Sequence, residues 1–527
     1  MITRRVFLGA CGMLGPGLSP RGVLARPAGA RDLRSFHLAV SPEALERTPG
    51  LLEAIRRAGV TDVWICGFFY GHWPFPIEAI RSWGRRAERQ GMAWHVINVP
   101  LGHPGDALGS RDGQFPLTPP GRWRLGRAAD GSSHAGTSIH PPAVEENADA
   151  MQQLARIGVR RVFLDDDFRL ARGPGILGGC TCDDHRRAFQ RAAGLDDGRW
   201  KGLIDAIARR DLTADVRAWV EFQCDEATSA FRAMRRASPE IDLGVMVMYL
   251  GAEKAGIRLA DYRDVPFRVG EGHFDDGSFG TVKGKMDELS SVLFHRRFAA
   301  PDRAFSETTA FPATRLSAAN MAAKLAISTI ADVRNTMFMS GLSAFPIGSW
   351  ATLGPAMKHQ AGIHRKLAGH APRGPLKHVW GEPSRYVGDD DPFSLFLALG
   401  IPFEVLDGPP RDGVAFLSRA DAARPPAASP ATLIARPAPG LSPRIRPKPE
   451  SFDALLGLKR ELIPGLGRNP YVEQDVPVVC AWYPTARAVL LWNPTEKRRD
   501  LTVKLGDLRR NTSLEPLGSA LIEDLPG

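Results

Sequence analysis

A repeated unit of helix end, glycine and buried strand constrains the fold of this chain most strongly. The unit occurs at residues 58–65, 90–97 and 157–164. In each copy a glycine closes a helical pattern, as helix C-terminal glycines do, and an apolar run follows it. Apolar runs of this length are typical of parallel strands buried on both faces. The alternation of helices and buried strands predicts an α/β fold.

Eight such strands can be placed along the first two thirds of the chain. They are expected at residues 35–40, 61–66, 93–98, 161–166, 242–249, 266–271, 303–307 and 335–340. Eight units predict a (β/α)₈ TIM barrel over residues 31–370, with enlarged loops after the third and fourth strands. A doubly wound open sheet is the alternative. It is disfavoured because no Gly-x-Gly-x-x-Gly motif follows the first strand.

The pattern changes after the barrel. Residues 371–470 predict a small α/β domain, with a helix at 394–399 and short strands at 400–406 and 414–417. Proline and alanine crowd residues 424–449, which predicts a loop or linker. Short alternating runs in residues 471–527 predict a small C-terminal all-β domain.

The first thirty residues predict a signal peptide. Arg4 and Arg5 stand before Val6-Phe7-Leu8, as in the twin-arginine export pattern, and a weakly apolar stretch follows to Leu24. We therefore expect export of the folded protein to a bacterial periplasm or beyond. A chance pair of arginines at a basic N-terminus is the alternative.

Composition excludes several classes of protein. The chain has 527 residues, 43% of them hydrophobic, and no apolar run near the length of a membrane span, so we expect no membrane partner after signal cleavage. The net charge of +10 comes from scattered arginines, which argues against a nucleic-acid partner. Without Cys11 the chain holds five cysteines, an odd number that predicts no disulfide framework.

Carboxylates end two strands that face each other across the predicted barrel. Asp165, Asp166 and Asp167 end the fourth strand, and Glu307 ends the seventh. The carboxyl ends of barrel strands carry the chemistry of this fold. Glycoside hydrolysis needs two carboxyl groups on either side of one bond, the first as acid and the second as nucleophile or base. A solvated acidic loop is the alternative for the three aspartates.

Other polar and aromatic side chains near strand ends are candidates for substrate contact, with core packing as the alternative for the aromatic ones. The full set expected to bind substrate is Asp165, Asp166, Arg169, Tyr249, Glu271, His273, Trp73 and Asn98.

The acidic segment and the residues after it resemble glycoside hydrolase family 42, the microbial β-galactosidases. That family ends its fourth strand in Asp-Asn-Glu-Tyr/Phe, followed by a Cys-x-Cys-x-x-Cys segment. Here Asp165-Asp166-Asp167-Phe168 precedes Cys180-x-Cys182-x-x-His185. The resemblance implies a barrel, an α/β trimerisation domain and a small β domain. It also implies a retaining glycosidase, with Asp167 as acid/base and Glu307 as nucleophile.

The chain departs from the family pattern at several points. Aspartates replace the acid glutamate and the asparagine beside it, and the shorter acid leaves an inverting mechanism open. The α/β domain is reduced, which argues against a trimer and leaves another homo-oligomer open. Galactose specificity is not implied.

The resemblance also implies a structural zinc ion, although no cofactor for catalysis. Cys180, Cys182 and His185 would be three of its ligands. The fourth would fall near Ser138 or His140, of which only the histidine can bind zinc.

Two other functions remain as alternatives. The first is a non-catalytic carbohydrate-binding protein on a degenerate glycosidase barrel, which differs from an enzyme in whether the fourth- and seventh-strand carboxylates share one cleft. The second, a metal-dependent amidohydrolase, is disfavoured because no His-x-His ends the first strand.

Overall fold

A computed structural model gives the fold of the chain. It describes residues 34–101, 119–165, 168, 170, 177–269, 272–389, 391–425, 429–437 and 440–526, with only the backbone for 134–137. The predicted signal peptide lies outside the described residues. So do four of the predicted site residues, Asp166, Asp167, Arg169 and Glu271.

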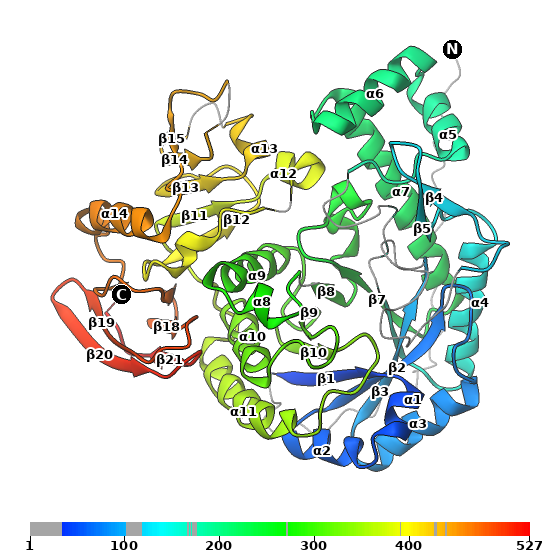
Figure 1. Cartoon of the computed structure of the whole chain (residues 1–527), viewed down its shortest axis with the longest axis horizontal. Helices are drawn as coiled ribbons and strands as arrows, with labels where there is room; N and C mark the ends of the chain where they lie inside the picture. The colour runs from blue at the N-terminus through cyan, green and yellow to red at the C-terminus, as the bar shows by residue number, and fades with distance from the viewer. Residues whose placement is uncertain are drawn as a thin grey trace, which may run out of the picture. The chain divides into compact units, whose positions relative to one another are not determined.

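Eight parallel strands close into a barrel, as predicted (Figure 1). Their order around the barrel follows the chain, and the last strand pairs with the first. The predicted and observed positions agree to within a few residues at every strand. The strands are β1 (Ser35–Val40), β2 (Asp62–Phe69), β3 (Ala93–Val99), β6 (Arg161–Leu164), β7 (Asp242–Val247), β8 (Phe267–Val269), β9 (Ala304–Thr309) and β10 (Asn335–Met339).

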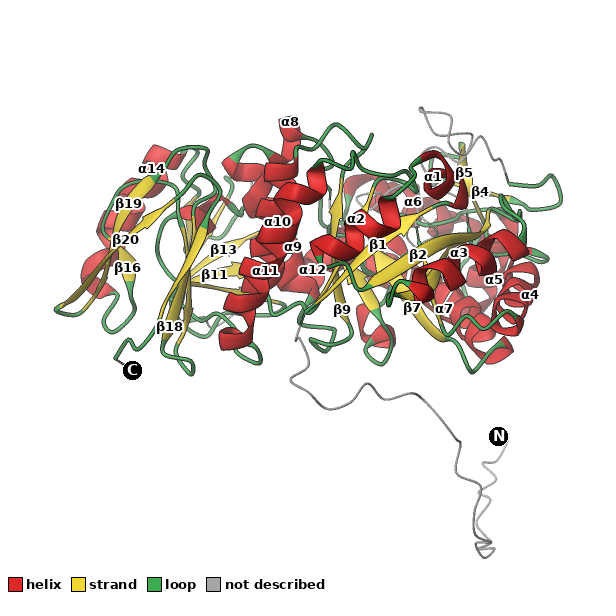
Figure 2. Cartoon of the chain, turned by 90° about the horizontal axis from the view of Figure 1, so that it is seen from below, coloured by secondary structure: helices red, strands yellow, loops and turns green. Residues whose placement is uncertain are grey.

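Helices surround the barrel strands, and Figure 2 shows α10 and α11 side by side on its outside. Several begin at a serine, threonine or aspartate whose side chain accepts a bond from the first turn, such as Thr213 and Ser317. The helices are α1 (Pro42–Arg47), α2 (Leu51–Ala58), α3 (Ile77–Arg89), α4 (Ala143–Arg156), α5 (Asp183–Ala193), α6 (Asp197–Arg209), α7 (Ala214–Ala237), η1 (Glu253–Ala255), η2 (Leu259–Tyr262), α8 (Asp276–Phe279), α9 (Val282–His295), α10 (Ala318–Ile330) and α11 (Ser349–Leu367).

The two enlarged loops that the sequence predicts are present. The connection after β3 contains the hairpin β4 (Leu125–Arg127) and β5 (Ser133–Thr137), and the connection after β6 contains α5, α6 and α7. Both connections leave from the carboxyl ends of barrel strands, where loops build the functional face of this fold.

The barrel interior is a packed aromatic layer. Trp64, Phe163 and Phe305 point inward from three strands, with ring centroids 4.8 Å apart for Trp64 and Phe163 and 4.9 Å for Phe163 and Phe305. Side chains two residues further along a strand point the same way. Asp165 and Glu307 therefore also face inward, on the carboxyl-end side of this layer.

A five-stranded parallel sheet follows the barrel in the order β12-β11-β13-β14-β15. The predicted strands at 400–406 and 414–417 are confirmed, and the predicted helix at 394–399 is one 3₁₀ turn. The prediction of a linker over 424–449 is wrong, because two strands of this sheet lie there and bury Ile434. The elements are β11 (Leu376–Val379), α12 (Glu382–Val387), η3 (Leu395–Ala398), β12 (Phe403–Leu406), β13 (Val414–Leu417), α13 (Arg419–Ala422), β14 (Thr432–Ala435), β15 (Ile445–Pro447), α14 (Phe452–Leu462) and η4 (Ile463–Gly465).

The C-terminal part consists of two three-stranded antiparallel sheets, as the all-β prediction requires. All residues from Leu33 to Gly527 belong to one compact unit, so the division at residues 370 and 470 stays a prediction. Within the described residues, no helix is long and apolar enough to span a membrane. The strands are β16 (Tyr471–Val472), β17 (Val479–Tyr483), β18 (Ala488–Trp492), β19 (Arg499–Leu505), β20 (Leu508–Leu514) and β21 (Ser519–Ile522).

Burial of His378 in β11 makes the fold sensitive to acid. Its ring lies parallel to those of Trp380 and Phe396, and desolvation lowers its pKa from 6.5 to about 3. Between pH 3 and pH 6.5, His378 therefore binds a proton in the unfolded chain but not in the folded chain. The free energy of unfolding therefore falls as the pH drops below 6.5, by about 2 kcal/mol at pH 5 for one such imidazole.

We predict that His378→Gln flattens this pH dependence. Urea unfolding of the wild type and the variant at pH 7.5 and pH 5 measures it. The exposed His359, changed to Gln, is the control and should leave the slope unchanged. An equal loss of unfolding free energy between pH 7.5 and pH 5 in the wild type and in His378→Gln would contradict the prediction.

Candidate active site

The carboxylates that end the fourth and seventh barrel strands meet on one buried arginine. Arg268, in the sixth barrel strand β8, has no exposed surface. Its Nη2 contacts Asp165 at the end of β6, and its Nε contacts Glu307 in β9. The structure thus brings together the two strand ends from which the sequence predicts the catalytic groups.

The surroundings of Arg268 fix its position. Its guanidinium carbon lies 5.4 Å from the centre of the Phe163 ring, and its Nη1 lies 3.3 Å from the sulfur of Met337. A guanidinium buried among apolar groups is stable only when carboxylates compensate its charge. Asp165 and Glu307 supply that compensation, and their own burial in turn depends on Arg268.

Glu307 is the better placed of the two described carboxylates for chemistry. It is 6% exposed, and the hydroxyl of Thr309, two residues further towards the carboxyl end, donates to its Oε2 at 3.3 Å. One carboxylate oxygen therefore faces the arginine and the other faces the end of the strand.

Tyr249 and His273 lie together near the same end of the barrel. Their ring centroids are 5.8 Å apart in an edge-to-face arrangement, and Tyr249 has a left-handed backbone with φ +44°. Burial lowers the pKa of His273 to about 4, helped by the charges of Lys324 and Lys283. The imidazole is therefore neutral near pH 7, and its buried Nδ1 has no hydrogen-bond partner among the described residues.

Trp73 and Asn98 have different environments. Trp73 is half-buried and packs on Phe68, with ring centroids 5.3 Å apart. Asn98 is fully buried, and its side-chain oxygen accepts the Phe68 N–H at 2.9 Å. Asn98 therefore holds the irregular end of β2, and substrate contact by either residue stays a prediction.

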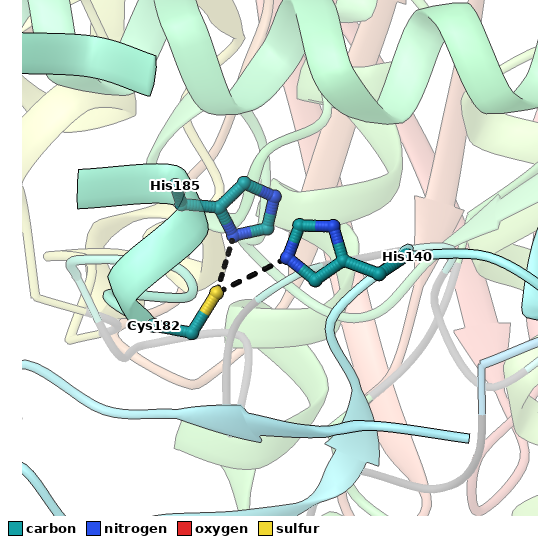
Figure 3. A group of neighbouring side chains, drawn as sticks. All are labelled: His140, Cys182 and His185. Atoms are coloured by element: carbon teal, nitrogen blue, oxygen red, sulfur yellow. Dashed lines mark hydrogen bonds between the residues drawn. The ribbon is translucent and has the colours of Figure 1, made fainter. Parts of the chain in front are cut away.

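A cluster of sulfur and nitrogen donors joins the two enlarged loops (Figure 3). His140 precedes α4, while Cys182 and His185 lie at the start of α5. His140 Nε2 is 3.2 Å and His185 Nδ1 is 3.5 Å from Cys182 Sγ. The three donor atoms lie within 4.8 Å of one another, as ligands of one metal ion do.

The electrostatics of this cluster favour a thiolate. A hydrogen bond from the Cys180 thiol lowers the pKa of Cys182, and those from His140 and His185 add to the effect. The same interaction raises the pKa of Cys180, together with burial. His185 is buried, and its Nε2, which lies 4.0 Å from Glu226 Oε2, has no hydrogen-bond partner in the described part of the chain. A thiolate and two imidazoles are donors that zinc prefers, so the residues present fit that ion.

The sequence prediction named most of this cluster but missed Arg268. It gave Cys180, Cys182 and His185 as ligands, with His140 as the candidate for the fourth, and the structure places His140 beside Cys182 and His185. Arg268 stands within the apolar run 265–269. A charge inside a buried strand requires a partner of opposite charge, and that signal could have led to the carboxylates at the ends of other barrel strands.

Solved structures with the same fold are β-galactosidases. The β-galactosidase of the psychrophilic Marinomonas ef1 is 10% identical, with a TM-score of 0.57 over 93% of this chain and 100% of that one. The β-galactosidase of Rahnella sp. R3 is 12% identical, with a TM-score of 0.56 over 93% and 98%. No family model and no curated protein sequence matches the chain. The resemblance expected from the sequence is confirmed as a likeness of fold, that of TIM-barrel β-galactosidases.

Proposed function

We propose that this protein is an exported glycoside hydrolase that acts on a glycoside or oligosaccharide with retention of configuration. The observation that carries the proposal is the buried contact of Arg268 with Asp165 and Glu307. It shows that the ends of the fourth and seventh strands face one another across the barrel. The β-galactosidase fold supports a carbohydrate as substrate.

Glu307 is the proposed nucleophile. Its carboxylate attacks the anomeric carbon while the bond to the leaving oxygen breaks, which gives a glycosyl ester. Arg268 is a positioning residue, because it holds Glu307 from the side away from the strand end and favours the ionised carboxylate.

Asp167 is the proposed acid/base. It gives its proton to the leaving oxygen in the first step. In the second it takes a proton from the water that attacks the ester and frees Glu307. Asp165, the described carboxylate nearest to Asp167 in the chain, supports this assignment indirectly. Its bond to Arg268 leaves the acid role to a neighbour further along the loop.

The proximity of the fourth and seventh strand ends supports retention. Retaining enzymes hold them about 5 Å apart and inverting ones roughly 6.5–9.5 Å, because the latter leave room for water. Two carboxylates that bind neighbouring nitrogens of one guanidinium are close together. The end of the fourth strand is thus near Glu307, as retention requires.

We predict that Glu307→Gln abolishes turnover of every substrate, because no glycosyl ester forms. Asp167→Ala should spare aryl glycosides with good leaving groups in the first step and slow alkyl glycosides by about 10²–10⁴-fold. Azide should then restore turnover of the aryl glycosides by Asp167→Ala, since it attacks the ester without base assistance. Steady-state kinetics with both substrate types measures these effects.

The control for loss of a buried glutamate is Glu288→Gln. Glu288 is 2% exposed and paired with Lys324, but it belongs to α9 outside the barrel. Full activity of Glu307→Gln would contradict the mechanism. Sugar binding by the wild type without turnover of any glycoside would favour the alternative, a carbohydrate-binding protein on a glycosidase barrel.

We also propose a structural zinc ion held by His140, Cys182 and His185. Cys180, the remaining ligand that the resemblance implies, would complete the set of four. When bound, zinc would replace the proton that the Cys182 thiol loses and would join the loops after β3 and β6. The thiolate character of Cys182 and the closeness of the three donor atoms, all within 4.8 Å of one another, support the proposal.

Elemental analysis should find about one zinc per chain, falling severalfold in Cys182→Ser. The melting temperature should fall in that variant and in wild type treated with a chelator. Cys224→Ser, at another buried free cysteine, is the control and should keep its zinc. A folded wild type free of zinc after growth in zinc-supplemented medium would refute the site.

Export is proposed from residues outside the described part of the chain. Replacing Arg4 and Arg5 by lysine should leave the protein in the cytoplasm, because the export receptor reads the arginine pair. Cell fractionation measures the outcome, and lysines at Arg21 and Arg26 are the control for loss of arginines. Unchanged periplasmic accumulation of the Arg4/Arg5 variant would refute the assignment.

A further inference from the structure

The sheet that follows the barrel has the strand order of a nucleotide- or cofactor-binding fold. Numbered along the chain, its strands lie in the order 2-1-3-4-5, and all are parallel. In such sheets the second strand lies on one side of the first strand, and the third strand lies on its other side. The crevice at the carboxyl ends of these strands is where ligands bind.

A pocket of about 330 Å³ occupies this crevice. It is lined by residues at and after the ends of β11, β12 and β13, by Leu212 from the α6–α7 connection and by Arg217 of α7. Its volume is at the lower end of the range for small-molecule sites, which suits a single ring. The apolar part of the wall comes from Val379, Leu417, Leu212, Pro383, Pro409 and Pro410.

Asp421 is the buried polar group of this pocket. It is 6% exposed, and its hydrogen bonds from Gly381 N–H and the hydroxyls of Ser384 and Ser418 all end on Oδ2. Oδ1 receives none of these three bonds, and the backbone N–H of Ser384 also interacts with the carboxylate. Burial raises the pKa of this carboxyl, as expected where water cannot solvate it.

The other charged groups around the pocket are mostly paired. Arg217 forms an ion pair with Glu382, and Asp407 with Arg297. Arg424 is exposed and donates from Nη2 to the carbonyl of Leu212, which leaves its other N–H groups directed to solvent or ligand. The pocket therefore offers an acceptor in Asp421, a donor in Arg424, an apolar wall and little net charge.

We propose that this pocket binds a neutral monosaccharide, at a site separate from the barrel. A sugar has hydroxyls that donate to Asp421 Oδ1 and accept from Arg424, and its C–H face can lie on the prolines. An amine would satisfy Asp421 but would face two guanidinium groups. A phosphate would satisfy Arg424 but would be repelled by Asp421 and Glu382. The site does not depend on the proposed catalytic activity.

Gly408 provides a variant that fills the pocket. It lines the pocket, its φ is not positive, and an added Cβ would meet no atom within 4 Å. Gly408→Phe should therefore fold and block the site. Gly457→Phe is the matched control, because Gly457 is equally open but lies on an exposed part of α14.

The test is hydrogen exchange of the full-length protein, read by mass spectrometry, with D-glucose, D-galactose or D-mannose. Binding slows exchange through local opening by a factor of 1 + [L]/Kd, so a hexose at ten times its Kd gives about tenfold slowing. We expect this slowing in residues 380–387 and 407–412 with at least one hexose. The slowing should persist in Gly457→Phe and disappear in Gly408→Phe. It should weaken in Arg424→Gln, and this second variant keeps the proposal testable if Gly408→Phe fails to fold.

Three outcomes would overturn the assignment. The first is that no hexose protects these segments in the wild type. The second is that protection is undiminished in a folded Gly408→Phe or, if that variant fails to fold, in Arg424→Gln. The third is that inorganic phosphate or methylamine, used as probes, protects the segments more strongly than every hexose. Slower exchange at the barrel strands alone would indicate that the hexose binds at the proposed active site and not in this pocket.

Discussion

The structure of the barrel mouth depends on one buried guanidinium. Arg268 has no exposed surface, so its charge must be balanced within the protein, and Asp165 and Glu307 do this from strands on either side. Removing one member of a buried ion pair typically costs about 3–5 kcal/mol, because the other charge is left without compensation. The three residues therefore hold one another in place. A carboxylate held in this way is preorganised to attack a substrate, since little reorganisation remains for the reaction.

The hydrophobic pattern of the sequence was sufficient to predict the barrel strands. It was insufficient to predict which polar side chains pair inside the barrel. Each strand is a short apolar run after a helix, so its position could be predicted from composition and periodicity alone. Arg268 lies 103 positions from Asp165 and about 40 positions from Glu307 in the chain. Their contact follows from the register of three parallel strands, which hydrophobicity does not specify. The strand Thr432–Ala435 was missed for a related reason: four residues among many prolines form a strand only because β13 pairs with them.

The cluster of His140, Cys182 and His185 connects two of the loops that leave the same end of the barrel. His140 ends the connection that leaves β3, and the other two lie in the connection that leaves β6 and carries Asp165 at its start. Long connections lose much conformational entropy when they order. A metal ion that links them would offset part of that cost. The resemblance to the glycosidase family implied Cys182 and His185 as ligands, and it also implied His140, some forty positions earlier, as the candidate for the fourth.

Helix α12 connects this mouth to the pocket of the neighbouring sheet. Its first residues, Glu382 and Pro383, line the pocket. Further along, Arg385 forms an ion pair with Glu253, which is 1% exposed, and the Gly388 carbonyl accepts from Lys254. Glu253 and Lys254 belong to the loop after β7, four and five residues after Tyr249. A ligand that shifts the start of α12 would therefore act on a loop of the barrel mouth through a buried ion pair, which has few alternative arrangements. The short helix is the physical route by which the two proposed sites of this chain would influence each other.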